Sequence, residues 1–175
     1  MTNFGLMISL SHLNAMSKED FISALGSIYE HSDWVAERVV PRRPFPNPEK
    51  LRLAMRQTVE DAVDEEKLAL IRAHPDLAGK LAQAGALTEA STREQAGLGL
   101  DRLSEGEYEQ FSNRNERYRE RFGFPFIICA RQTSKQGVLD ALEARLANST
   151  EAEISEALRQ IHEIARLRLE DVIVG

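Results

Sequence analysis

Helical periodicity is the dominant pattern along the chain. After Ser17, a residue suited to cap a helix, the apolar residues Phe21, Leu25 and Ile28 recur at helical spacing. Similar spacing predicts further helices over 32–40, 48–73, 88–96, 104–119, 138–146 and 150–172. Sustained alternation of apolar and polar residues is missing from the sequence, so strands are expected to be marginal at best.

Prolines and one aromatic segment interrupt these helices. Four of the six prolines fall between Pro41 and Pro48, which predicts a loop. The helix over 48–73 is expected to stop at His74, because the ring of a proline disfavours the helical conformation in the residue before it. Only Phe124–Cys129 is predicted to be extended. We therefore expect an all-α, single-domain bundle of about seven to eight helices, with a short extended Phe-Gly-Phe-Pro-Phe segment.

Composition and charge narrow the functional classes. With 175 residues, of which 42% are hydrophobic and 29% charged, residues 1–175 are expected to form one globular domain. A net charge of −6 argues against nucleic acid as a partner. The apolar stretch Phe4–Leu10 is too short for a membrane span and lacks preceding basic residues, so neither a membrane partner nor a targeting signal is expected. Cys129 is the only cysteine and cannot form an internal disulfide, which favours the reducing cytoplasm.

His74 is the first residue whose surroundings suggest chemistry. A helix is expected to end just before it and Pro75 restricts the chain just after it, so the imidazole would be held on a rigid corner. A histidine held in this way is suited to proton transfer near neutral pH. Taken alone, however, this local pattern more often belongs to a helix-capping histidine without chemistry.

Three polar residues share one face of the predicted helix 88–96. Ser91, Glu94 and Gln95 are spaced i, i+3 and i+4, so their side chains could converge on a polar ligand. The Ser-x-x-Glu spacing is also the capping-box pattern, in which both side chains satisfy backbone amides at a helix start. Both interpretations stay open, because a capped helix start also presents amides to an anion or a carbonyl group.

An arginine lies close to the apolar stripe of the last predicted helix. The stripe consists of Ile154, Leu158, Ile161, Ala165 and Val172. At about 100° per residue, Arg168 points within roughly 40° of the stripe, whereas Arg166 lies about 120° away. An arginine that faces a core needs a partner, which is either an ion pair or a ligand's carboxylate or amide oxygen.

The segment 121–131 is the fourth candidate. Three phenylalanines lie around Gly123 and Pro125, which is incompatible with a continuous helix. The backbone groups of this segment are expected either to pack in the core or to bind a ligand. Cys129 is expected to be a packed thiol rather than a nucleophile. The sequence contains neither metal-ligand spacings nor a phosphate-binding glycine loop, so no metal site is expected.

Four short stretches, taken in order, resemble one known family. They are His74-Pro75-Asp76-Leu77, Ser91-x-x-Glu94-Gln95, Asn115-x-x-Tyr118 and Phe122-Gly123-Phe124-Pro125-Phe126-Ile127. Their order and spacing are similar to those of the 2-oxo-4-hydroxy-4-carboxy-5-ureidoimidazoline (OHCU) decarboxylases of uric acid degradation. The resemblance runs from about Leu10 to the last helix and covers nearly the whole chain.

This resemblance implies an all-α, cofactor-free enzyme that is commonly a homodimer. It implies loss of carbon dioxide from the substrate OHCU, with stereospecific protonation to (S)-allantoin. On the same basis His74, Glu94 and Arg168 are the catalytic residues, with Arg166 as the alternative arginine. The implied substrate-contacting positions are Pro75, Ser91, Gln95, Ile127, Ile128, Cys129, Ala130 and Arg131.

Two other functions compete with this one. A non-catalytic helical binding module would use the apolar segment as a groove for a partner. A cofactor-free lyase or hydrolase could instead act on a related ureido compound, because a fold can be shared while the substrate differs. The co-occurrence of His74, Glu94 and Arg168 favours an enzyme over a binding module, which has no need of that trio.

Overall fold

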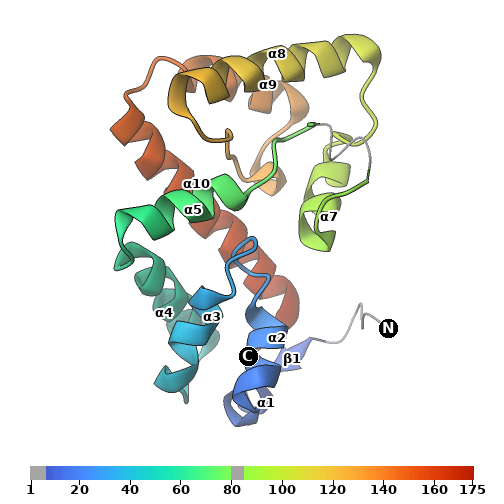
Figure 1. The fold of residues 1–175 in the computed structure, drawn as a ribbon. Coiled ribbons are helices and arrows are strands. Elements are labelled where there is room, and N and C mark those ends of the chain that lie inside the picture. The colour runs from blue at the N-terminus through green and yellow to red at the C-terminus, as the bar shows by residue number, and fades with distance from the viewer. Residues whose placement is uncertain (1–6, 80–84) are drawn as a thin grey trace. The chain divides into compact units, whose positions relative to one another are not determined.

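Helices dominate the computed structural model, which describes residues 7–79 and 85–175. These ranges contain nine α-helices, all of which are labelled in Figure 1. The chain divides into two compact units. Unit 1 comprises the described residues up to Leu70 together with His162–Gly175, and unit 2 comprises Ile71–Ile161. The all-α prediction is confirmed, and a single domain over residues 1–175 stays a prediction.

Unit 1 is built mainly from the first four helices. They are α1 (Leu10–Ala15), α2 (Lys18–Leu25), α3 (Trp34–Val39) and α4 (Pro48–Glu60), with a 3-10 turn η1 at Val40–Arg42. Ser17 caps α2 as predicted, since its hydroxyl accepts a hydrogen bond from the Asp20 amide. The Arg43 guanidinium fastens the proline loop, because it donates to the Met16 carbonyl at 2.6 Å.

Two very short strands pair within unit 1. Ile8–Ser9 (β1) and Ile173–Val174 (β2) are parallel, with Ile8 opposite Ile173. Two residues are too few to show alternation, so the sequence pattern could not predict them. Residues 4–6 of the stretch Phe4–Leu10 lie outside the described residues. None of the helices described is both long and apolar enough to cross a membrane.

Unit 2 contains three further complete helices. They are α7 (Glu89–Gly97), α8 (Glu105–Phe122) and α9 (Lys135–Arg145), with a 3-10 turn η2 at Ala130–Gln132. A capping box of Ser104 and Glu107 begins α8, and Gly123 ends it in the left-handed conformation (φ 78°). The helices α8 and α9 pack against each other (Figure 1). The last helix, α10 (Thr150–Val172), begins in unit 2 and ends in unit 1.

The predicted helix over 48–73 is wrong as a continuous helix. The structure has α4 up to Glu60 and a separate α5 (Asp64–Ala73). Three acidic residues, Asp64 to Glu66, form the first turn of α5, where they suit the positive end of the helix dipole. Val63, which continued the apolar spacing of α4, is 63% exposed in the turn. The apolar spacing of α4 therefore continues by coincidence beyond Glu60, where the helix ends.

The helix α9 begins earlier than predicted, and one helix was not predicted. Lys135 rather than Val138 starts α9, because the Ser134 hydroxyl accepts a hydrogen bond from the Gly137 amide and caps the helix. The six residues of α1 are too few to show a clear apolar face, although Ser9 caps this helix.

A buried histidine in unit 1 makes stability sensitive to acid. The Tyr29 hydroxyl lies 2.9 Å from Nδ1 of His162. Burial raises the pKa of Tyr29, so the hydroxyl keeps its proton and forms a neutral hydrogen bond with the ring. Burial, reinforced by the nearby Arg56, lowers the pKa of His162 to about 4. His162 is therefore neutral in the folded protein at neutral pH.

We expect His162 to destabilise the fold as pH falls. His162 binds a proton near pH 6.5 in the unfolded chain but only near pH 4 in the folded protein. The free energy of unfolding therefore falls as the pH is lowered from about 6.5 to about 4. Linkage gives a loss of about 2 kcal/mol between pH 7 and pH 5 from this group. Urea unfolding at both pH values should show that His162→Gln, which keeps an acceptor for Tyr29, loses about 2 kcal/mol less than the wild type. An equal loss in both proteins would contradict this account.

Candidate active site

His74 begins a tight loop at the end of α5. The helix ends at Ala73, as predicted, and the His74 side chain is only 7% exposed. Four residues later, the fully buried Ala78 adopts the left-handed conformation (φ 56°). Such a conformation costs a residue other than glycine about 1–3 kcal/mol, so surrounding contacts must hold the loop in place.

Side chains from α7 and α8 provide those contacts. The Gln95 amide is engaged at both ends: Oε1 accepts from the Ala78 amide at 2.9 Å, and Nε2 donates to the Asp76 carbonyl at 3.4 Å. Asn115 donates from Nδ2 to the Leu77 carbonyl at 2.8 Å. Arg119 donates to the Asp76 carboxylate at 2.8 Å. We call this set of contacts the loop clamp, since it holds the backbone that follows His74.

The polar face of α7 is turned inward. Ser91 and Gln95 are buried, and Glu94 between them is partly exposed. The capping-box interpretation of Ser91 and Glu94 is wrong, because the helix begins earlier and is capped by Thr88, whose hydroxyl accepts from the Ser91 amide. Ser91 therefore lies inside the first turn of the helix, and its side chain belongs to the inward face.

The extended segment after α8 is held by buried polar side chains. The Cys129 amide donates to Gln160 Oε1 at 2.8 Å, and the Ile127 carbonyl accepts from Arg145 Nη1 at 2.6 Å. The thiol of Cys129 is buried, as expected of a packed cysteine. The 3-10 turn η2, which follows this segment, packs against α7. The turn Ala130–Gln132 is thus placed next to the helix that carries Ser91, Glu94 and Gln95.

A buried ion pair stabilises this segment. Arg145 lies over the Phe126 ring, 4.3 Å from its centroid, and donates to Glu153 at 2.8 Å. Glu153 is 0% exposed and also accepts from the Tyr118 hydroxyl at 2.5 Å. Burial, together with this bond, raises the pKa of Tyr118, so the hydroxyl remains a donor. Arg145 and Glu153 therefore neutralise each other's charge in the core.

Unit 2 thus brings three of the predicted stretches together: the His74 loop, the inward face of α7 and the segment that ends in η2. Their predicted site residues are His74, Pro75, Ser91, Glu94, Gln95, Ile127, Ile128, Cys129, Ala130 and Arg131. The catalytic and substrate-contacting roles of these residues stay predictions. Within the described ranges, no group of three or more His, Cys, Asp or Glu residues is arranged to hold a metal ion.

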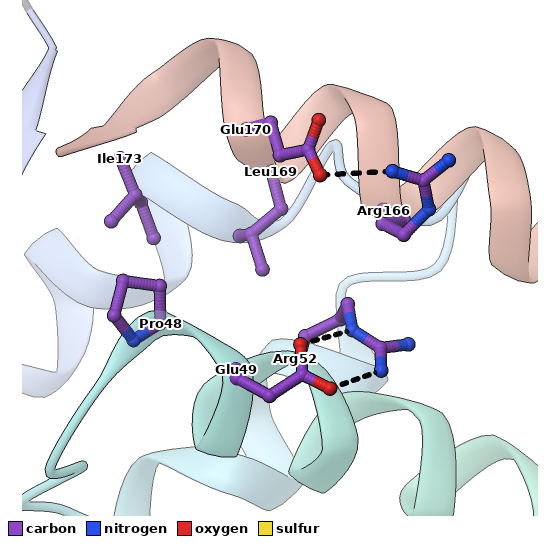
Figure 2. A pocket seen from close by; sticks show the side chains of 7 residues that line it. All are labelled: Pro48, Glu49, Arg52, Arg166, Leu169, Glu170 and Ile173. Atoms are coloured by element: carbon purple, nitrogen blue, oxygen red, sulfur yellow. Dashed lines mark hydrogen bonds and ion pairs between the residues drawn. The ribbon is translucent and has the colours of Figure 1, made fainter. Parts of the chain in front are cut away.

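The two candidate arginines of α10 have different surroundings in unit 1. Arg168 is 5% exposed, and its Nη1 donates to Glu30 at 2.7 Å and to the Ser27 carbonyl at 3.3 Å. The prediction that Arg168 faces inward and takes a partner is confirmed. Arg166 instead pairs with Glu163 and Glu170. It lines a pocket of about 120 Å³ with Pro48, Glu49, Arg52, Leu169, Glu170 and Ile173, as Figure 2 shows.

Comparison with known proteins identifies the family. A family model described as OHCU decarboxylase matches residues 14–170. The chain belongs to the OHCU decarboxylase family.

Individual members of this family resemble the chain closely. A 2-oxo-4-hydroxy-4-carboxy-5-ureidoimidazoline decarboxylase of Haloferax volcanii is 44% identical over 93% of this chain and 94% of its own length. A uric acid degradation bifunctional protein of Bacillus subtilis is 42% identical over 95% of this chain but only 33% of its own length. A crystal structure of (S)-allantoin synthase superposes with a TM-score of 0.77 at 33% identity, over 95% of this chain and 54% of that one. The chain therefore spans about half of that structure.

The loop clamp yields a test of its own. Truncation of Asn115 to alanine leaves the buried Leu77 carbonyl without its donor, so we expect Asn115→Ala to lower the free energy of unfolding by about 1–3 kcal/mol. Asn113→Ala is the matched control, because Asn113 lies on the same helix but is exposed. The control should stay within about 0.5 kcal/mol of the wild type in urea unfolding. Equal stability of the two variants would show that the clamp does not hold the loop.

Proposed function

We propose that this chain decarboxylates OHCU and releases (S)-allantoin, a step of uric acid degradation. The observation that carries this proposal is the family match over 14–170, which includes every predicted site residue. The arrangement in unit 2 supports it, because a buried histidine, a glutamate and main-chain groups lie on elements that pack together.

The chemistry requires no cofactor in this proposal. When the bond to the carboxylate carbon breaks, carbon dioxide leaves and the electron pair stays on the ring carbon. The neighbouring imine or carbonyl of the imidazoline can hold that pair, so the substrate supplies its own electron sink. The hydroxyl on the carbon that lost carbon dioxide then gives up its proton and becomes a carbonyl. A proton adds to the neighbouring ureido-bearing carbon, which becomes the stereocentre of allantoin. The protein has to orient the substrate, stabilise the developing anion and deliver that proton.

His74 delivers the proton to one face of the ureido-bearing ring carbon, which makes a single enantiomer. Its fixed position after α5 serves this role, because a proton donor must stay within hydrogen-bond reach of the atom it protonates. Glu94 either orients His74 or bonds the hydroxyl and ureido groups of the substrate. Arg168 holds a substrate oxygen through its guanidinium.

Further predicted residues complete the proposed binding site. Pro75, Ser91, Gln95 and the backbone of 127–131 contact the substrate in this proposal. The Gln95 amide already bonds the loop at both ends, so it also serves the reaction by keeping the backbone after His74 in place.

The homodimer and the cytoplasm belong to the same proposal. The homodimer follows from the family resemblance, and light scattering during size-exclusion chromatography tests it directly. The cytoplasm is supported by the single, buried cysteine, since proteins of oxidising compartments use disulfides. Immunodetection after separation of cytoplasm and membranes tests this location.

The decisive assay generates OHCU from urate with the two upstream activities and follows its decay and the circular dichroism of the product. We expect OHCU to decay rapidly to a single enantiomer of allantoin, because His74 protonates one face of the ring. His74→Ala should lose about 10²–10⁴-fold in rate, the usual contribution of a proton donor. His12→Ala is the matched control, since His12 is exposed at the end of α1.

Two outcomes would overturn the proposal. Unchanged decay and racemic product from folded wild-type protein would reject OHCU as the substrate. Allantoin, allantoate and 5-hydroxyisourate, run in parallel, would then show whether a related ureido compound is turned over. Full activity in a folded His74→Ala variant would reject the role of His74 alone.

A further inference from the structure

Glu30 is a buried carboxylate that the proposed reaction does not use directly. Its side chain is 2% exposed, in the turn between α2 and α3. Removal of a carboxylate from water costs several kcal/mol unless a charged partner and good geometry compensate. The charged partner is Arg168, whose Nη1 lies 2.7 Å from Glu30 Oε2. The fold therefore buries the Glu30 carboxylate next to the guanidinium of Arg168, a proposed catalytic residue.

The turn that carries Glu30 is tightly constrained. A Cβ atom on Gly26 would lie 2.7 Å from the backbone carbonyl oxygen of Ile22 and 2.6 Å from Asp33 Oδ1, so glycine is required at this close approach. His31, directly after Glu30, adopts the left-handed conformation (φ 48°). The Ser32 hydroxyl donates to the Glu30 carbonyl at 2.9 Å. Strained backbone of this kind persists only where surrounding contacts determine it, and it gathers at functional sites.

These contacts fix the direction of the Arg168 guanidinium. Nη1 is held by two acceptors, the Glu30 carboxylate and the Ser27 carbonyl at 3.3 Å. Both acceptors lie on the constrained turn. Because the guanidinium is planar, fixing one of its nitrogens against two acceptors restricts the orientation of the whole group. The Arg168 side chain is thus already ordered before substrate binds, so binding loses less side-chain entropy.

We propose that Glu30 is a positioning residue, whose buried carboxylate preorganises Arg168 to hold a substrate oxygen. This inference rests on the proposed function, in which Arg168 binds OHCU. Glu30 acts through the guanidinium and does not touch the reacting atoms. Loss of its charge therefore weakens binding of the substrate and product more than it slows the chemical step.

A double-mutant cycle tests this coupling. Glu30→Gln keeps an acceptor oxygen but removes the charge, and Arg168→Gln removes the guanidinium. We expect Glu30→Gln to raise KM for OHCU and Kd for (S)-allantoin about tenfold, with a smaller change in kcat, because a charge-assisted hydrogen bond is replaced by a neutral one. In the Arg168→Gln background the same change should have no further effect, since the group it positions is gone.

Two control variants separate positioning from general stability. Glu170→Gln removes the partner of Arg166 on the same helix, and it should leave KM unchanged. Val59→Ala opens a cavity in the core of unit 1, which lowers Tm without touching the pair. A KM increase in Val59→Ala equal to that in Glu30→Gln would reduce the effect of Glu30 to lost stability and overturn the proposal.

The remaining outcomes are also decisive. Effects of Glu30→Gln and Arg168→Gln that multiply in the double variant would show that Glu30 does not act through Arg168. If Glu30→Gln fails to fold, Glu30→Asp replaces it, because this variant keeps the charge but withdraws it by one methylene, and the same KM increase is expected. Wild-type protein that leaves OHCU unchanged would overturn the proposed function and this inference together, whereas active wild type with an unaffected Glu30 variant would overturn the inference alone.

Discussion

The placement of His74 depends on one constraint, the conformation of the loop that follows α5. The loop contains a buried alanine in the left-handed region, which the backbone does not adopt without external support. Gln95 and Asn115 supply that support from two different helices, through bonds to three consecutive residues of the loop. Helix α7 consequently has two tasks, since the face that presents Ser91 and Glu94 also fixes the backbone after the histidine.

Buried polar groups organise the rest of unit 2 in a similar way. Among the described residues, no strand pairs with the segment between α8 and η2, so its backbone groups need side chains as partners. Gln160 and Arg145 serve this purpose, and Glu153 neutralises the arginine inside the core. In unit 1 the pair of Glu30 and Arg168 follows the same logic. Each buried charge is placed where it determines the position of a main chain or of another charge.

The sequence predicted local features better than long-range ones. Helices, the stop before His74, the cap at Ser17 and the inward direction of Arg168 depend on neighbouring residues, and the structure confirms them. The break between α4 and α5 was missed, because the apolar spacing continued through an exposed valine. The burial of Glu30 and Glu153 could not be predicted from the sequence, because a glutamate is ordinarily exposed. Only the tertiary fold brings an arginine next to each of them. Asn115 stood out within a motif, but its bond to Leu77 spans 38 positions and could not be foreseen.

The burial of Cys129 has a practical consequence. It is the chain's only thiol, it is 1% exposed, and it directly precedes the turn η2, which packs against α7. A thiol reagent cannot reach a sulfur atom in this position unless the segment opens. The rate of covalent labelling at Cys129 is therefore a built-in reporter of local opening in the candidate active site, without any introduced probe.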